Sequence, residues 1–141
     1  MTPPVASIVN LDTGAAFAFV AEGSPVRAQL KAFVQGKVMI MCQTAQAEFL
    51  NAVSKYGGPL EQARAARLLT RLTGVPDNPS PRVLALRTTQ GVQPPDKIIF
   101  GTGDALAAVT ATTDARFVRA AAAQGVVIAA AVFPQFRLRG L

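Results

Sequence analysis

Histidine and tryptophan are absent from this sequence of 141 residues, and cysteine occurs once, as Cys42. Without histidine the chain cannot form a conventional zinc site or a histidine-based catalytic triad. A nucleophilic cysteine would need a base that this composition does not provide, so we predict that Cys42 is a buried, unreactive thiol. These absences exclude several whole classes of enzyme chemistry.

Acidic residues are also scarce, with eight Asp and Glu against fourteen Lys and Arg, and the formal net charge is +6. Such a charge attracts polyanions and raises the rate of encounter with them, which makes nucleic acid the obvious candidate partner. The alternative is a merely basic protein, because the basic residues are dispersed and Arg64, Arg67 and Arg71 fit one solvated helix face.

No apolar run is long enough to span a membrane, since even residues 120–133 are too few and are interrupted at Gln124 and Gly125. The N-terminal segment lacks the basic start and apolar core of a secretory signal, so we expect a cytoplasmic location. Export within a larger protein or by a dedicated injection machine would leave no such mark. The length fits a single domain, residues 1–141.

Short β-branched runs alternate with helical patterns along the chain. We predict strands at residues 5–11, 37–42, 82–86, 109–113 and 126–132, and helices at 14–20, 25–35, 45–55, 60–72, 96–106 and 115–124. Ser24 is expected to cap the second helix, and residues 74–81 and 88–95 to form a turn and a loop. This alternation predicts an α/β fold, with a central parallel sheet of about five strands between layers of helices.

Four of the eight acidic residues fall where this fold would gather them: Asp12, Glu48, Asp96 and Asp114. Asp12 and Asp114 directly follow the first and fourth strands, and ligands in such folds bind at the carboxyl ends of strands. If those strands are neighbours, both carboxylates reach one crevice. Glu48 and Asp96, each near the start of a helix, can point into it.

Clustered carboxylates repel one another unless they share protons or hold a cation. Mg²⁺ or Mn²⁺ fits a set of oxygen ligands and supports phosphodiester cleavage without histidine or cysteine. The alternative is that Asp96 and Asp114 are ordinary helix caps and that Glu48 is a solvated helix residue. A further acid, Asp104, follows Gly101-Thr-Gly103, a segment that fits neither the phosphate-loop nor the dinucleotide-binding pattern. We expect its glycines to allow close helix packing or a kink, with Asp104 as an auxiliary acid.

At these positions the chain resembles the PIN-domain family of metal-dependent ribonucleases, which includes the toxin nucleases of bacterial toxin–antitoxin pairs. Four segments carry the resemblance: Ile-Val-Asn-Leu-Asp-Thr at 8–13, Thr-Ala-Gln-Ala-Glu-Phe-Leu at 44–50, Pro-Asp at 95–96 and Thr-Ala-Thr-Thr-Asp-Ala-Arg-Phe at 110–117. The resemblance implies a three-layer α/β/α sandwich with strand order 3-2-1-4-5. The sequence departs from the family pattern at Gly101-Thr-Gly103, where the family usually has a continuous helix.

The resemblance also implies a site and a function. Mg²⁺ or Mn²⁺ would be held by Asp12, Glu48, Asp96 and Asp114, with Asp104 as an alternative third acid. A hydroxyl of Thr13 or Thr112 would lie near the metal or substrate, and Arg116 and Arg119 are the nearest basic candidates for the RNA backbone.

We therefore predict a metal-dependent endoribonuclease, with a catalytically inactive PIN-like scaffold that binds RNA or a protein as the alternative. A third possibility is a toxin neutralised by an antitoxin or immunity protein, docked on residues 133–141 or on the helix at 60–72. A homodimer is expected because PIN relatives often dimerise.

Overall fold

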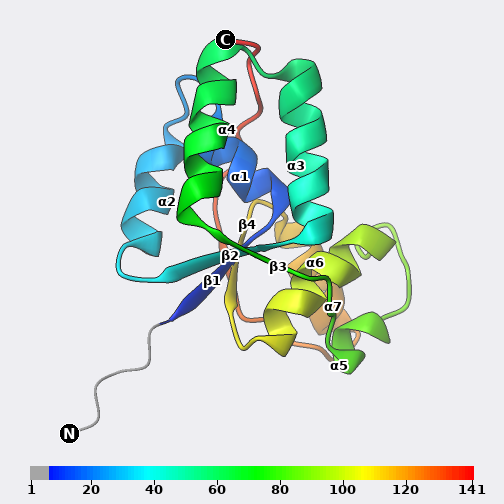
Figure 1. Ribbon diagram of the computed structural model, residues 1–141. Coiled ribbons are helices and arrows are strands. Elements are labelled where there is room, and N and C mark those ends of the chain that lie inside the picture. Colours follow the sequence, from blue (N-terminus) through cyan, green and yellow to red (C-terminus); the bar gives the residue numbers. More distant parts are fainter. Residues whose placement is uncertain (1–6) are drawn as a thin grey trace, which may run out of the picture.

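The computed structural model describes residues 7–141 and contains one five-stranded sheet (Figure 1). Its strands are β1 (Ile8–Leu11), β2 (Val38–Cys42), β3 (Thr73–Val75), β4 (Val109–Thr112) and β5 (Ala130–Val132). All neighbouring strands are parallel, in the order β3-β2-β1-β4-β5. The predicted α/β class and the predicted strand order 3-2-1-4-5 are therefore confirmed.

Helices cover both faces of the sheet, because right-handed crossovers change face where the strand order reverses beside β1. They are α1 (Thr13–Val20), α2 (Val26–Val34), α3 (Gln43–Tyr56), α4 (Pro59–Arg71), α5 (Pro81–Leu84), α6 (Pro94–Ala105) and α7 (Ala115–Ala123). Figure 1 shows α1 to α4 on one side of the sheet and α5 to α7 on the other. No helix within residues 7–141 is long and apolar enough to cross a membrane.

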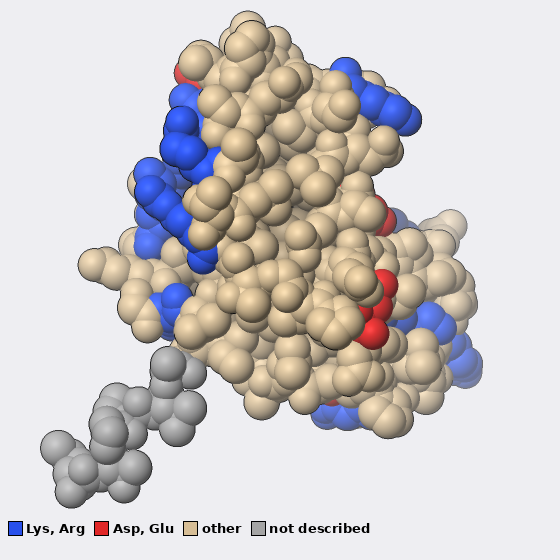
Figure 2. All heavy atoms as spheres, viewed as in Figure 1, with Lys and Arg blue, Asp and Glu red and all other residues tan. Residues whose placement is uncertain are grey.

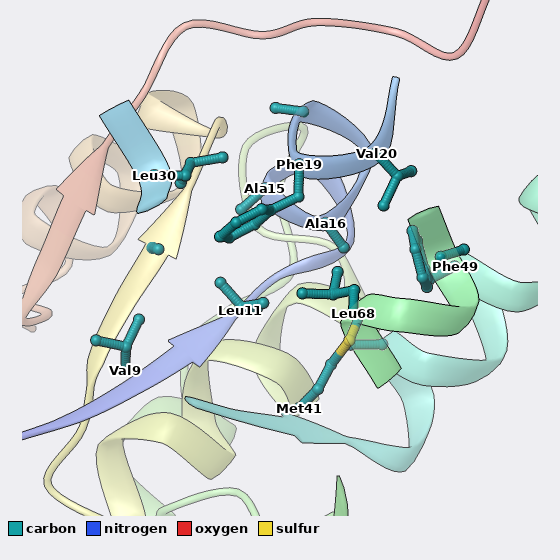
Figure 3. Close-up of a cluster of buried hydrophobic side chains, with 14 of the residues drawn as sticks. Val9, Leu11, Ala15, Ala16, Phe19, Val20, Leu30, Met41, Phe49 and Leu68 are labelled. Atoms are coloured by element: carbon teal, nitrogen blue, oxygen red, sulfur yellow. The ribbon is translucent and has the colours of Figure 1, made fainter. Parts of the chain in front are cut away.

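The central strand β1 is buried on both faces, which explains its largely apolar sequence, and its one polar residue, Asn10, donates hydrogen bonds to the carbonyl of Ile99 and the hydroxyl of Thr110. On the side of α1 to α4, Leu11 packs with Ala15 and Phe19 of α1 and with side chains of α3 and α4, as Figure 3 shows. The small alanines of α1 let this helix approach the sheet closely. Cys42 at the end of β2 is fully buried, and burial raises the pKa of its thiol to about 11, as expected of an unreactive cysteine.

The predicted position of the third strand was wrong. Residues 82–86 were predicted as a strand, but α5 occupies Pro81–Leu84, and the third strand lies at Thr73–Val75, where a turn was predicted. Ser80 followed by Pro81 at the first helical position favours a helix start, and this signal outweighs the apolar pattern of the segment. The edge strand β3 pairs only with β2, and its three residues are too few to show an alternating pattern.

Several predicted boundaries also differ from the structure. Ser24 does not cap α2, because its hydroxyl donates a hydrogen bond of 2.6 Å to the carbonyl of Ala18. Asp96 is the third residue of α6 rather than its cap, and β5 begins at Ala130 rather than at residue 126. Residues 5 and 6 of the predicted first strand lie outside the described residues. The remaining helix predictions agree with the structure to within about two residues.

The Gly101-Thr-Gly103 segment lies inside a continuous α6. A Cβ atom at Gly101 would lie 2.6 Å from Cβ of Pro79, and one at Gly103 would lie 2.6 Å from Nδ2 of Asn10. The expectation that these glycines permit close packing is confirmed. The helix is continuous, so the interruption expected at this segment does not occur.

Glu61, in the first turn of α4, is a fully buried carboxylate that ties the C-terminal segment to the protein. It accepts hydrogen bonds from the backbone N–H groups of Glu22, Gly58, Arg139, Gly140 and Leu141, at 2.8 to 3.2 Å. In addition, Phe133, Phe136 and Leu138 pack against the core. The segment 133–141 (the tail) therefore packs along the protein with most of its residues exposed, and its use as a docking surface stays a prediction.

We expect Glu61→Gln to lower the free energy of unfolding by about 2–4 kcal/mol, because the amide leaves buried N–H donors poorly paired. Burial opposes ionisation of Glu61, but the backbone hydrogen bonds outweigh it and lower its pKa below the ordinary value of 4.5. The stability that ionised Glu61 gives to the wild type over the variant is therefore fully present above pH 4.5. It is lost as the pH falls through the lower pKa that Glu61 has in the folded protein.

Urea unfolding from pH 7 to pH 3 measures this difference. The matched control is Glu22→Gln, which removes a partly exposed ion pair with Arg64 and should cost less than about 1 kcal/mol. Equal costs for the two variants would contradict the role assigned to Glu61.

Candidate functional site

A pocket of about 330 Å³ lies where the carboxyl ends of β1 and β4 meet. Ten residues line it: Asp12, Thr13, Gly14, Glu48, Asp96, Ile99, Phe100, Thr113, Asp114 and Gln135. The four acids that the sequence pattern singled out are thus brought to one place (the carboxylate pocket). No Lys or Arg is among the lining residues, although the chain as a whole carries a net charge of +6.

Asp12 follows β1 and caps α1, with one carboxylate oxygen accepting a 2.7 Å hydrogen bond from the N–H of Ala15. Its other oxygen accepts a hydrogen bond from the hydroxyl of Thr112, at the end of the neighbouring strand β4. Only 6 % of Asp12 is exposed. Burial, reinforced by the nearby charge of Asp114 and only partly opposed by these hydrogen bonds, raises its pKa to about 6.

Asp114 caps α7 by accepting a hydrogen bond of 3.1 Å from the N–H of Phe117. Its own N–H donates to the hydroxyl oxygen of Thr112 at 2.8 Å. Thr112 therefore connects Asp12 with the backbone of Asp114, which fixes the two strand-end acids relative to each other. The predicted cap at Asp114 is confirmed, and this capping hydrogen bond uses only one of its carboxylate oxygens.

Glu48 and Asp96 reach the pocket from helices. The hydroxyl of Thr13 donates to Oε1 of Glu48 at 2.7 Å, which ties α3 to the start of α1. Asp96 accepts a hydrogen bond of 3.1 Å from the N–H of Gln93. Burial raises the pKa of Asp96, and the charges of Asp114 and Glu48 raise it further, against the lowering effect of that hydrogen bond.

Four other predicted residues do not line the carboxylate pocket, and one of them, Thr112, is fully buried and hydrogen-bonded to Asp12. Asp104 forms an ion pair of 2.6 Å with Arg82 and accepts a hydrogen bond of the same length from Ser80, and its pKa is lowered, mainly by the hydrogen bond from Arg82. The structure thus places Asp96, and not Asp104, beside the other acids. Arg116 and Arg119 are exposed on α7 and do not line the pocket, and Arg116 donates to Gln90 at 3.0 Å.

Sequence reasoning did not single out Gln135 or Gly14. Gln135 lies in the tail and belongs to no motif, so only the folded position of the tail reveals it. Gly14 is the second residue of α1, where a Cβ atom would lie 2.1 Å from the hydroxyl oxygen of Thr113. That contact is visible only in three dimensions.

The donor chemistry of the pocket fits a hard divalent cation. The charge of Asp114 raises the pKa values of Asp12 and Asp96, that of Glu48 also raises the pKa of Asp96, and no basic side chain among the lining residues offsets these charges. In the part of the chain that the structure describes, however, no three acidic side chains converge closely enough to form a complete ligand set. Mg²⁺ is commonly held by one or two carboxylates, with water and substrate phosphate as the remaining ligands, so the arrangement and the ion are compatible.

The fold and this pocket define a PIN-like α/β protein with acidic residues at the carboxyl ends of its central strands. The chain belongs to the family described as "Protein of unknown function (DUF1308)", which matches residues 9–138. It is also similar in fold to a chain in the crystal structure of VapBC2 from Rickettsia felis bound to a DNA fragment from their promoter. That match has a TM-score of 0.61 and 16 % identity, and it covers 87 % of this chain and 98 % of the other.

We expect Asp12→Asn to stabilise the protein by about 1–3 kcal/mol at pH 8, with metal removed by chelator. Because the folded-state pKa of Asp12 is about 6, above its ordinary 3.8, ionisation favours unfolding. The wild type therefore loses stability as the pH rises between these values, and the difference from the variant vanishes below pH 3.8. Asparagine retains an oxygen to cap α1.

The control is Asp77→Asn. Asp77 accepts hydrogen bonds from the backbone N–H and the hydroxyl of Thr44, and these outweigh burial and lower its pKa. This variant should be destabilised at pH 8, opposite in sign to Asp12→Asn. Unfolding curves at pH 3.5 and pH 8 measure both, and destabilisation by Asp12→Asn would contradict the electrostatic description of the pocket.

Proposed function

We propose that this protein is an endoribonuclease that uses Mg²⁺ or Mn²⁺ at the carboxylate pocket. The observation that carries the proposal is the gathering of four acids around one pocket at the carboxyl ends of the two central strands, in a basic protein. The PIN-like fold supports the same activity. The principal alternative remains a PIN-like scaffold that binds RNA or a protein without cleaving it.

In this proposal the cation lies among Asp12, Glu48, Asp96 and Asp114, with one or two of these carboxylates as direct ligands, and when bound it would activate water and stabilise charge on the phosphodiester. Thr112 orients the carboxylate of Asp12, and Thr13 orients that of Glu48. Since the pKa values of Asp12 and Asp96 are raised, ion binding displaces protons and is tighter at higher pH. Arg116 and Arg119, on the helix that Asp114 caps, contact the RNA backbone.

The test is cleavage of a panel of structured and single-stranded RNAs with Mn²⁺, with Mg²⁺ and with chelator, together with calorimetric titration of each ion. Asp12→Asn and Asp114→Asn should abolish cleavage and weaken ion binding. Thr112→Val should reduce ion affinity or activity by about 10–100-fold, because it leaves the ligands intact but loses their orientation. Asp104→Asn, outside the pocket, is the matched control and should cleave normally.

Wild-type protein that neither cleaves RNA nor binds either ion would favour the non-catalytic scaffold. If the Asp12→Asn protein is folded and stable while cleavage is lost, its inactivity cannot be attributed to unfolding.

A second candidate function, binding of an acidic protein partner, is favoured by a groove of about 360 Å³ between α2 and α4. Five basic residues line this groove (the basic groove): Arg27, Lys31, Arg64, Arg67 and Arg71. No acidic residue lines it, and Figure 2 shows Lys and Arg side chains along the edge of the molecule formed by these helices. Burial, and then the charge of Arg64, lower the pKa of Arg27, against the opposing charge of Glu22.

The floor of the basic groove is apolar, with buried Phe19 and Leu68 beside Met39 and Val34. An apolar floor between basic rims fits an amphipathic segment with acidic edges, such as an antitoxin or immunity protein would supply. The helix at 60–72, considered from the sequence as a docking surface, provides one wall of this groove as α4.

We expect the double variant Arg67→Glu with Arg71→Glu to lose a co-purifying acidic partner while its RNA cleavage changes little, since the basic groove and the carboxylate pocket share no residue. The control is Arg119→Glu on α7, which reverses a charge outside the basic groove. This variant should retain the partner but bind RNA less well. A partner retained equally by all three proteins would exclude the basic groove as its site.

A further inference from the structure

A second pocket, of about 360 Å³, adjoins the carboxylate pocket, because Gly14 and Gln135 line both. Its other lining residues are Phe17 of α1, Ala52 and Tyr56 of α3, and Phe136, Arg137 and Leu138 of the tail. The sequence contains only nine aromatic residues, eight Phe and one Tyr, and three of them line this one pocket. We call it the aromatic pocket.

The aromatic side chains here are accessible, unlike those of the core. Tyr56 is 68 % exposed at the end of α3, and Phe17 and Phe136 are partly buried. Phe17 is backed by buried Phe49, with ring centroids 5.9 Å apart, so this part of the wall is fixed by the core. A concave site with aromatic walls and a few polar groups at its edge is typical of small-molecule and base-binding sites.

The polar groups at its edge favour a nucleotide over a purely apolar ligand. Gln135 supplies an amide that can both donate and accept hydrogen bonds, and exposed Arg137 supplies a cation for a phosphate or for stacking on a base. No acidic side chain lines the aromatic pocket, whereas the adjoining pocket is lined by four. A ligand that spans both pockets would therefore place a planar apolar group in the aromatic pocket. It would place a phosphate, together with a cation, in the carboxylate pocket.

We propose that the aromatic pocket binds the nucleobase of the nucleotide next to the phosphodiester held in the carboxylate pocket. The base stacks on Tyr56 and contacts Phe17 and Phe136, while Gln135 meets polar atoms between the two pockets. Stacking of this kind is tolerant of sequence, because every base has a π-face. The proposal rests on the proposed function for the identity of the neighbouring phosphate, but binding of a base can be measured without metal or cleavage.

Binding in the aromatic pocket can be followed by tyrosine fluorescence, because Tyr56 is the only tyrosine in the sequence and there is no tryptophan. The intrinsic fluorescence of the protein therefore comes from this pocket. Titration with adenosine monophosphate in the presence of chelator should quench it saturably, whereas ribose 5-phosphate, which has no base, should not. The same titration of N-acetyltyrosinamide corrects for light absorbed by the base.

Ala52→Leu should fill the aromatic pocket and weaken nucleotide binding by about tenfold or more. Ser54→Leu is the matched control, since Ser54 is exposed on the same helix outside the pocket, and it should bind as the wild type does. In RNA cleavage, Tyr56→Ala should raise KM, and Tyr56→Phe, which keeps the stacking surface, should restore it.

Equal quenching by adenosine monophosphate and ribose 5-phosphate, or equal weakening by both leucine variants, would overturn the proposal. So would tighter binding of N-acetylphenylalaninamide than of the nucleotide, which would indicate a pocket for a peptide side chain. Metal-dependent RNA cleavage without saturable quenching would refute the base site and leave the nuclease intact. Quenching without ion binding or cleavage would support the base site and refute the nuclease.

Discussion

Parallel pairing of β1 with β4 is the constraint on which the site depends. The register sets Leu11 opposite Ala111, so both strands end at the same edge of the sheet, and the next residues in each chain segment are Asp12 and Thr112. The hydroxyl of Thr112 donates a hydrogen bond to the buried carboxylate of Asp12, and burial of this carboxylate lowers the stability of the fold when it is ionised. Such a cost is common at functional sites, where activity rather than stability determines the residue.

A second constraint acts from the opposite end of the chain. The buried carboxylate of Glu61 accepts three backbone hydrogen bonds from residues 139–141, and the apolar side chains of the tail pack on the core. Gln135, at the junction of the carboxylate and aromatic pockets, is thereby held in place by contacts made several residues away. The surroundings of the acidic cluster thus depend on a polar interaction in the first turn of α4.

The sequence was sufficient to predict the sheet order through the resemblance of four of its segments to the PIN-domain family. It also placed Asp12 and Asp114 directly after buried strands, so that their convergence followed if those strands were neighbours. It was insufficient for β3, whose three residues carry no periodicity, and for α5, where an apolar pattern concealed the helix start at Pro81. The pairing of Asp104 with Arg82, the capture of the tail by Glu61 and the position of Gln135 depend on the proximity of residues 22 to 123 positions apart. No local pattern encodes such contacts.

The capture of the tail by Glu61 also orders events during synthesis. Residues 133–141 follow every described strand and helix along the sequence, so Gln135 and the aromatic wall formed by Phe136 cannot take their places until those elements have been synthesised. All four acidic residues of the pocket precede the tail in the sequence. A nascent chain would therefore expose carboxylates without the walls that position a substrate, and its competence would begin only when the tail is seated.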